Sequence, residues 1–494
     1  MRFPDSRPVV VASILVILCS APGATAREIP LATTVAAELI DIDGVPLAAL
    51  EDGLTAAVFV VGESDGRLKM QWLDAAGRPL FAADGLEIAG DDGDITGASV
   101  IARPGGGAFV AYARVAGSGD PRLFAQAFDR SGAPLWPGSG VRVSTLPGPQ
   151  REVALVPDFV GGVYACFARP DQRAAACQHL DRDGDRLWTE AGHDVGGGPG
   201  LKIRPQVAYD GAEGLLVFWR NQGDLTDERP DFATVEGQHF NSPGVALWGD
   251  GIEVRSTYLP ESADSPAGVL AALGDGNGGA YVIYSARLSV NSPNLDVVMQ
   301  RVSGGDNLLW EDFRPVIADP GATELAAVVP APDGGFVVIT QEPADVAGSH
   351  LRLFRIDPQG FQLWGASGLA LSDPTSTTLD MLPHADFHGG VLRVAWTRQV
   401  AESSPEMDID LARFNLDGSR LGRVDSVVTA APNSQLCRGL VFHSSPPRTV
   451  VLWEDLRKGS PADVDIYAGL FRASALFGDG FELGDTSAWT TVTP

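Results

Sequence analysis

The stretch FDRSGAPLWPGSG, residues 128–140, decides the fold because its pattern returns along the chain. An aspartate and a glycine form a turn, a Leu-Trp pair follows, and another glycine precedes a short apolar strand. LDRDGDRLWTEAGHDV at 180–195 and IDPQGFQLWGASGLAL at 356–371 repeat this order. The pattern is not a catalytic motif. We interpret it as one piece of a unit that occurs many times.

The spacing of the Leu-Trp pair gives the unit a length of about 57 residues. A strand that ends in an Asp, Asn or Gly turn stands before each pair, and a second hairpin lies further upstream. This hairpin occurs eight times, starting near residues 45, 99, 152, 206, 268, 324, 381 and 439. The pair itself, including degenerate forms, stands at Leu80-Phe81, Leu135-Trp136, Leu187-Trp188, Leu247-Trp248, Leu309-Trp310, Leu363-Trp364 and Leu421-Gly422.

Two hairpins per unit predict a sheet of four antiparallel strands, which cannot cover both of its faces alone. Such sheets bury one another when they pack side by side around an axis. We therefore predict an all-β fold, a β-propeller of eight four-stranded blades over residues 27–473, with seven blades as the alternative. The last unit has a third strand, DVDIYAGLF from Asp463, but no fourth. We predict that the N-terminal segment TTVAAELIDID, residues 33–43, fills that place and closes the ring.

The recurring tryptophans have a structural interpretation. A large ring at a fixed point of each blade fills the widening gap between neighbours and stabilises the fold by about 1.5–3 kcal/mol. Blade packing is the predicted role of five residues: Trp136, Trp188, Trp248, Trp310 and Trp364.

Residues 1–26 have the pattern of a signal peptide. Arg2 and Arg7 precede the apolar run VVVASILVILC from Val9, and Ala24–Ala26 is an A-x-A cleavage site. A lipoprotein cysteine at Cys19 is less favoured, because a leucine rather than a small residue precedes it. No later segment is apolar enough for a transmembrane helix. We predict a mature protein that is secreted, periplasmic or held at the cell surface, and monomeric.

The net charge of −27 excludes the usual basic surface of nucleic-acid-binding proteins. Export would place the mature cysteines in an oxidising compartment. Cys166 and Cys177 flank a short predicted hairpin, which favours a disulfide between them. Two buried free thiols are the alternative, and Cys437 has no evident partner.

Two resemblances add to this interpretation. VVLWEDLRKGSPADVDIYAGLF, residues 450–471, together with the D-x-x-G-x-x-L-W segments, resembles uncharacterised repeat arrays in exported bacterial proteins. That resemblance implies a propeller-like fold and assigns no catalytic residue. FGDGFELGDTSAW, residues 477–489, resembles an FxDGFExGxTSxW tail of exported proteobacterial proteins. It implies an export, sorting or attachment role for residues 474–494, with a plain flexible tail as the alternative.

The sequence offers few candidates for metal or catalytic chemistry. His384, Asp386 and His388 stand in PHADFHGG, which we interpret as a surface turn without a third metal ligand. The acidic segments DRDGD at 181–185 and GDDGDITG at 90–97 resemble calcium loops but lack the EF-hand context. We predict plain turns and no cofactor, with calcium as the alternative. Nucleophile elbow, HExxH, phosphate-loop and dinucleotide motifs are absent from the sequence.

Two functions fit these observations. The first is a secreted, non-catalytic scaffold whose variable loops bind a protein or a glycan. The second is a secreted hydrolase or lyase that acts on a polysaccharide through two carboxylates. We favour the scaffold because insertions are longest in a few connections, which begin near residues 220, 255, 286 and 398.

Overall fold

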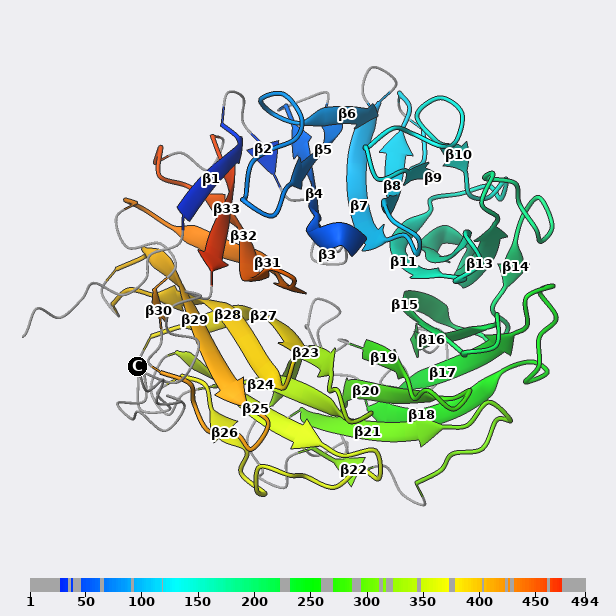
Figure 1. The fold of residues 1–494 in the computed structure, drawn as a ribbon. Helices are drawn as coiled ribbons and strands as arrows, with labels where there is room; N and C mark the ends of the chain where they lie inside the picture. Colours follow the sequence, from blue (N-terminus) through cyan, green and yellow to red (C-terminus); the bar gives the residue numbers. More distant parts are fainter. Residues whose placement is uncertain are drawn as a thin grey trace, which may run out of the picture.

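Eight antiparallel sheets stand in a ring around a central axis (Figure 1). This computed structural model describes residues 27–472 except 34–36, 39–45, 63–65, 90–92, 118, 223–231, 259–269, 287–294, 311–313, 317–322, 344–347, 373–377, 402–403, 423–424, 427–430 and 460–462. The predicted β-propeller of eight blades is confirmed, and the seven-blade alternative is wrong. The helical segments among the described residues are two 3-10 turns, Glu51–Gly53 and Pro170–Gln172.

Each blade runs outward from the axis, and consecutive strands of a blade are hydrogen-bonded neighbours. Blade 1 consists of β2 (Ala37–Glu38) with β3 (Leu47–Ala49), β4 (Thr55–Val61), β5 (Arg67–Leu73) and β6 (Leu86–Ala89), and blade 2 of β7 (Asp94–Ala102), β8 (Ala108–Val115), β9 (Arg122–Phe128) and β10 (Val141–Arg142). Blade 3 consists of β11 (Arg151–Pro157), β12 (Val163–Arg169), β13 (Ala174–Leu180) and β14 (His193–Asp194). Blade 4 consists of β15 (Leu201–Tyr209), β16 (Leu215–Gln222), β17 (Phe232–Phe240) and β18 (Ile252–Tyr258).

Blades 5 to 8 follow the same plan. Blade 5 consists of β19 (Leu270–Gly274), β20 (Ala280–Ala286), β21 (Asp296–Val302) and β22 (Arg314–Pro315), and blade 6 of β23 (Glu324–Pro330), β24 (Phe336–Pro343), β25 (Ser349–Ile356) and β26 (Leu369–Ala370). Blade 7 consists of β27 (Asp380–His388), β28 (Val391–Gln399), β29 (Met407–Asn415) and β30 (Asp425–Ser426). Blade 8 consists of β31 (Gln435–Ser444), β32 (Pro447–Asp455), β33 (Asp465–Arg472) and β1 (Arg27–Ala32).

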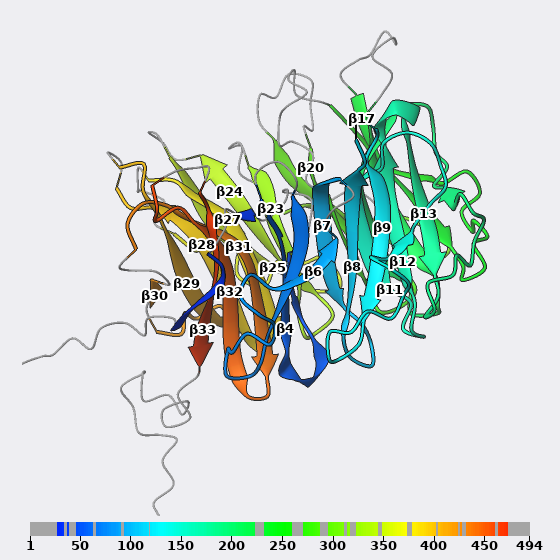
Figure 2. The ribbon, with the colours of Figure 1, turned by 90° about the horizontal axis from the view of Figure 1, so that it is seen from above.

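Two kinds of connection lie on opposite faces of the ring (Figure 2). The turn between the first and second strands of a blade is called its inner turn, and the one after the third strand, which carries the Leu-Trp pair, its outer turn. Both lie on one face, here called the turn face. Connections from the second to the third strand, and from one blade to the next, lie on the other face, here called the loop face. Strict antiparallel alternation forces this division.

Strand β1 pairs with β33 in blade 8, with Arg27 opposite Leu470 and Ile29 opposite Ala468. The prediction that residues 33–43 fill this place is wrong. Its described strand residues, Ala37–Glu38, pair instead with β4 in blade 1. The physical reason lies in the REIPLA sequence of β1, in which Ile29, Leu31 and Ala32 are buried while Glu28 and Pro30 are exposed, so that the strand presents an apolar face to the ring.

The core consists of apolar clusters that lie between neighbouring blades. One cluster combines Phe109 and Leu123 of blade 2 with Val163 and Phe167 of blade 3. Another joins Ile29 and Leu470 of blade 8 to residues of blade 1. Because each cluster draws on two sheets, a blade buries its faces only when both neighbours are present.

The interface between blade 8 and blade 1, here called the seam, has polar contacts of its own. Thr55 Oγ1 and His443 Nε2 lie 2.7 Å apart in a buried contact. The guanidinium of Arg448, itself buried, donates to the carbonyl oxygen of Gly53. Burial, and then the positive charge of Arg448, lower the pKa of His443 to about 4. His443 is therefore neutral in the folded protein at physiological pH.

Closure by β1 is tested with Ile29→Asp. This change buries a carboxylate in the apolar seam and should reduce the free energy of unfolding by about 3 kcal/mol or more. The control is Glu28→Gln, which removes only an exposed ion pair with Arg457, worth about 0–1 kcal/mol. Denaturant unfolding measures both. Equal stability of the two variants would contradict the closure.

Stability should fall as the pH drops from 7 to 5.5. The unfolded chain protonates His443 near its ordinary pKa of 6.5, whereas the folded protein does not until about pH 4. Linkage then removes about 1.4 kcal/mol of stability across this window. His443→Gln should flatten the pH dependence by that amount, as measured by denaturant unfolding at the two pH values. If the free energy of unfolding depends on pH equally in His443→Gln and in the parent, His443 is not a neutral, buried side chain in the folded protein.

Candidate functional site

The predicted tryptophans lie at interfaces between blades. The indole N–H of Trp136 in blade 2 donates to the carbonyl oxygen of Arg182 in the outer turn of blade 3, at 3.0 Å. The ring covers Gly184 in the same turn, where an added Cβ would lie 2.8 Å from the indole. The glycine and the tryptophan of neighbouring motifs therefore fit together, and each outer turn is held by the blade before it.

The same contact recurs around the ring. Trp188 donates to Ser242, Trp248 to Gly304 and Trp364 to Leu416, in each case in the outer turn of the following blade. Trp310 of blade 5 packs in an apolar cluster with Phe336 and Ile356 of blade 6. At the seam, Arg27 donates to the carbonyl oxygen of Ala76, and Ile29 covers Gly77 of blade 1. β1 thus replaces the tryptophan that blade 8 lacks.

A buried glutamine, which the sequence analysis missed, fixes the outer turn from within its own blade in blades 1 to 5. Gln126 Oε1 accepts from the backbone N–H of Trp136 at 3.0 Å, and Nε2 donates to the Trp136 carbonyl at 3.1 Å. A sequence signal exists, because glutamine stands three positions before the turn in QWLD, QAFD, QHLD, QHFN and QRVS. The equivalent buried residues are Gln71, Gln178, Gln238 and Gln300.

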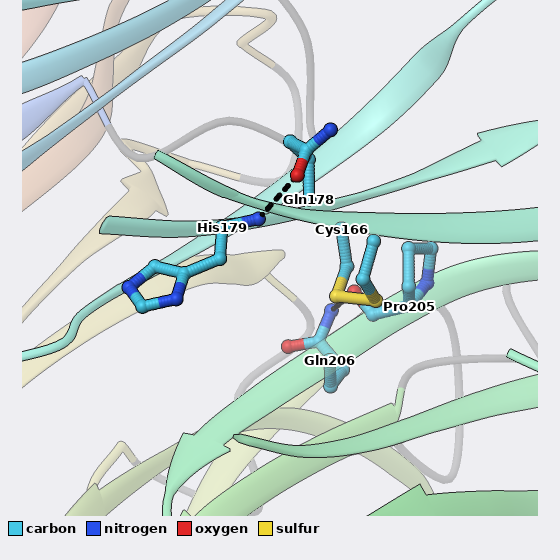
Figure 3. Close-up of a disulfide and its surroundings, with 6 residues drawn as sticks. Cys166, Gln178, His179, Pro205 and Gln206 are labelled. Carbon is cyan, nitrogen blue, oxygen red and sulfur yellow. Dashed lines mark hydrogen bonds between the residues drawn. A yellow bond between two sulfur atoms is a disulfide. The ribbon is translucent and has the colours of Figure 1, made fainter. Parts of the chain in front are cut away.

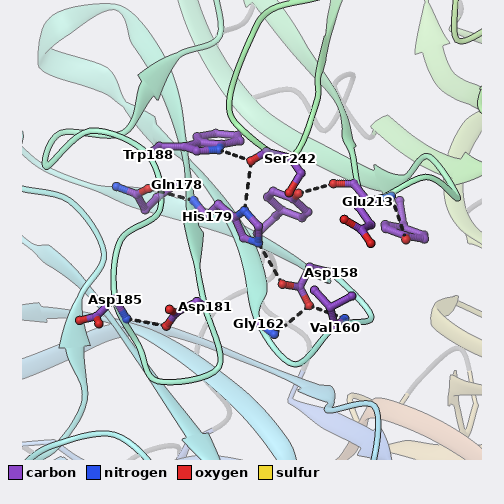
Figure 4. Close-up of polar contacts among 12 residues, drawn as sticks. Asp158, Val160, Gly162, Gln178, His179, Asp181, Asp185, Trp188, Glu213 and Ser242 are labelled. Carbon is purple, nitrogen blue, oxygen red and sulfur yellow. Dashed lines mark hydrogen bonds and ion pairs between the residues drawn. The ribbon is translucent and has the colours of Figure 1, made fainter.

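On the turn face, two blades contain a buried Asp-His pair. His179 Nε2 lies 2.9 Å from Asp158 Oδ2, and its Nδ1 faces the carbonyl oxygen of Ser242 in the next blade (Figure 4). His239 makes the same two contacts, with Asp210 at 2.9 Å and with the Gly304 carbonyl at 3.0 Å. Neither pair was predicted, because the partners are far apart in the sequence.

In the next two blades an arginine takes the place of the histidine. Arg301 binds Asp275 and the Pro358 carbonyl, and Arg355 binds Asp333 and the Leu416 carbonyl. An arginine is always a cation and only donates hydrogen bonds. With their two ring nitrogens the histidines face the same kinds of partner, a carboxylate and a backbone carbonyl of the next blade. The pairs are therefore bridges between blades rather than catalytic dyads, which need a ring nitrogen free to reach a substrate.

The aspartates of these pairs also shape the inner turns. Asp158 Oδ1 accepts from the N–H groups of Val160 and Gly162, at 2.8 and 2.7 Å. Burial opposes the ionisation of Asp158, but the hydrogen bonds from His179 and from the two N–H groups outweigh it and lower the pKa of Asp158. The carboxylate is thus charged and fully engaged, which supports a structural role.

Cys166 and Cys177 form a disulfide between β12 and β13, with their Cα atoms 4.0 Å apart. They are direct cross-strand partners in the register of blade 3. Pro205 and Gln206 of blade 4 lie beside the bridge (Figure 3). The third mature cysteine, Cys437, is buried with a free thiol, and burial raises its pKa to about 12. A thiol in that state is unreactive.

The loop face carries the long insertions. They connect β16 to β17, β18 to β19, β20 to β21 and β28 to β29, which are all connections of the loop-face kind. Most of the inserted residues lie outside the described part of the chain. The strand ends that bear three of them belong to the adjacent blades 4 and 5, so the insertions emerge close together on one side of the ring.

Carboxyl groups that are buried, such as Asp380, or half-buried also stand at strand ends on this face. Desolvation raises the pKa values of four of them, Asp296, Glu324, Asp380 and Asp408. In blade 7, Asp380 accepts from the Trp396 indole at 2.9 Å, and Arg398 binds Asp410 at 2.6 Å. These acidic groups of blade 7 belong to one sheet. They do not meet the expectation for an enzyme, in which carboxylates converge from different blades.

The metal candidates have local partners. Asp181 Oδ1 accepts from the N–H groups of Asp183 and Asp185, at 2.9 Å each, as in a plain turn. The histidines of PHADFHGG are not in a turn as predicted. Strand β27 continues to His388, and the turn is made by Gly389 and Gly390, which adopt positive φ. Asp386 accepts from the backbone N–H of Phe442.

Within the described part of the chain, His, Cys, Asp and Glu side chains form no group of three or more suited to a metal ion. Asp91 and Asp92, in the other acidic segment, lie outside it. The same residues contain no helix that could cross a bilayer.

Comparisons with known proteins give the fold alone. No protein-family model and no curated protein sequence matches the chain. Similar solved structures include a puromycin hydrolase, at 14% identity and TM-score 0.45 over 88% of this chain and 61% of that one. An ulvan lyase of family PL25 has 11% identity and TM-score 0.46, over 91% and 98%. The α-L-arabinofuranosidase Arb93A from Fusarium graminearum has 9% and 0.35, over 65% and 92%.

These likenesses are too distant to carry an activity or a substrate to this chain, which spans 61% of the length of the puromycin hydrolase. The chemistry of the site must be argued from the residues themselves.

The bridge interpretation is tested at His239. His239→Arg should keep the free energy of unfolding within about 1 kcal/mol, because the arginine can reach the same two acceptors, as Arg301 does. His239→Leu leaves the buried side chain of Asp210 without its partner and should remove about 1–3 kcal/mol. Denaturant unfolding at neutral pH separates the two. A similar loss in both variants would show that size, rather than hydrogen bonding, is what the site requires.

Proposed function

We propose that the protein is a secreted, non-catalytic scaffold that binds a protein or a glycan through its loop face. The observation that carries the proposal is the position of the long insertions. Four connections that the sequence marks as variable all belong to one face of the ring. Variable loops on a rigid frame are where binding function usually resides.

The contrast between the two faces supports this assignment. The turn face repeats the glutamine contact in blades 1 to 5 and an Asp-His or Asp-Arg pair in blades 3 to 6, and these polar groups hold the ring together. The loop face varies in connection length. A chain that holds one face constant and changes the other resembles other repeat proteins that present a binding surface on a common frame.

Export is part of the proposal. The predicted cleavage site ends at Ala26, and strand β1 begins with the next residue, Arg27. Removal of residues 1–26 would therefore leave the closing strand intact. The negative net charge and the resemblance of the tail to exported proteins support the same location.

Binding arrays of proteins and glycans, probed with residues 27–494 with and without calcium, test the proposal. In two variants, a short Gly-Asn-Gly link replaces residues 223–231 or residues 287–294. We expect a ligand whose affinity falls about tenfold or more in at least one of them. Gln359→Ala, an exposed change in the outer turn of blade 6 on the turn face, is the control and should bind this ligand as the parent does.

Parent-like affinity of both loop variants for every ligand found would refute the loop face as the binding surface. Ligand binding only in the presence of calcium would assign calcium to the interaction.

The second candidate function is polysaccharide cleavage. It is favoured by the raised pKa values of Asp380 and Asp408, since a general acid needs a carboxyl group that keeps its proton. Incubation with acidic and neutral polysaccharides, followed by measurement of new chain ends, tests it. Cleavage that Asp380→Asn abolishes would replace the scaffold proposal with this one.

A further inference from the structure

Three inner turns of the turn face share the pattern Asp-x-x-x-Gly. They span residues 158–162, 210–214 and 275–279, in blades 3, 4 and 5. In each, the aspartate accepts from the N–H groups two and four residues later. This geometry places the second and fourth residues of the turn in the left-handed region, which glycine adopts without strain.

Glycine stands at most of these left-handed positions. Gly211 and Gly276 have φ of 85° and 72° at the second position, and Gly161 and Gly278 have φ of 116° and 84° at the fourth. The two exceptions are Phe159 in blade 3, with φ of 62°, and Glu213 in blade 4, with φ of 64°. A bulky side chain in this region is strained, and such strain clusters at functional sites.

Burial in the core does not account for either exception. The side chain of Phe159 is 55% exposed and that of its neighbour Val160 is 63% exposed, so neither residue gains the burial of a core position. Glu213 is exposed as well. Both replace a residue type that neighbouring blades use in the same turn, and both put a larger side chain into solvent.

Tyr209 links the two exceptions, Phe159 and Glu213. The ring of Phe159 lies with its centroid 4.6 Å from that of Tyr209, at the end of β15 in blade 4. The Tyr209 hydroxyl accepts from the backbone N–H of Glu213 at 3.0 Å, and the Tyr164 hydroxyl donates to the Glu213 carbonyl at 2.5 Å. Figure 4 shows Glu213 close to the Asp158 turn. We call Phe159, Val160 and Tyr209 the aromatic platform.

The surroundings of the platform are polar. Glu213 follows Tyr209 in blade 4, and Arg182, which is close to Gly161, lies with Asp183 in the outer turn of blade 3. The side chains of Arg182 and Asp183 are 73% and 71% exposed. The apolar surface is thus confined to about one aromatic pair. Its area is far below the roughly 1,000 Å² that a specific protein interface buries.

We propose that the aromatic platform binds a pyranose ring of a glycan. A pyranose presents a face of C–H groups that packs on an aromatic ring, and hydroxyl groups at its edge that need charged or polar partners. Phe159 and Tyr209 supply the aromatic surface for the C–H face, and Glu213 and Arg182 supply polar partners for the hydroxyl groups. This site lies on the turn face and does not depend on the loop-face proposal.

Glycan-array binding followed by calorimetry on the best oligosaccharide tests the site in residues 27–494. Phe159→Gly should weaken binding about tenfold or more while the melting temperature stays within about 2 °C of the parent or rises, because glycine suits the backbone there. Phe159→Trp should retain binding. Phe361→Ala removes an equally exposed phenylalanine in blade 6 and is the matched control, expected to bind as the parent does.

The assignment is wrong if no glycan binds, or if Phe159→Gly binds every glycan hit as tightly as the parent. It is also wrong if Phe159→Gly lowers the melting temperature by more than about 5 °C, which would show that the ring serves the fold. Loss of a protein ligand instead of a glycan in this variant would equally overturn it. Binding lost in the loop variants but kept in Phe159→Gly belongs to the loop face, so the two proposals fail separately.

Discussion

A backbone carbonyl in the outer turn is the point on which most pairs of neighbouring blades depend. In blade 4 it belongs to Ser242, which accepts from the Trp188 indole and faces the ring of His179. The glycine of the same turn lies under the tryptophan ring. One short turn therefore receives an indole and an imidazole from the blade before it. Without these contacts, the blades would be joined by apolar packing alone, which leaves their relative position loosely specified.

The periodic part of this arrangement was visible in the sequence. The Leu-Trp pair and the eight upstream hairpins predicted the blades and their number, because each copy repeats the same turn chemistry. The contacts that join blades were not visible. His179 and Asp158 lie 21 residues apart, and His239 and Asp210 lie 29 apart, so no fixed spacing marks the pairs. The buried glutamines had a constant spacing, but their role appeared only with the backbone they bind.

The closing strand and the strained turns show two other limits of prediction from the sequence. REIPLA is six residues long and lies directly after the predicted cleavage site, so its alternating pattern was too short to stand out against the segment that follows. Phe159 looked like any turn residue until its backbone conformation was known. Repetition predicts what the blades share, whereas binding depends on where they differ. Those differences lie in long connections and in single residues at unusual dihedral angles.

The pairing of β1 with β33 reverses the order of synthesis. Residues 27–32 leave the ribosome before any other part of the ring, yet the strand they pair with, Asp465–Arg472, is made last. Seven blades can form while the first strand has no partner, and its apolar residues stay exposed until the last strand has folded beside it. A chain truncated just before residue 465 would keep most of its sheets and still leave both ends of the ring unpaired.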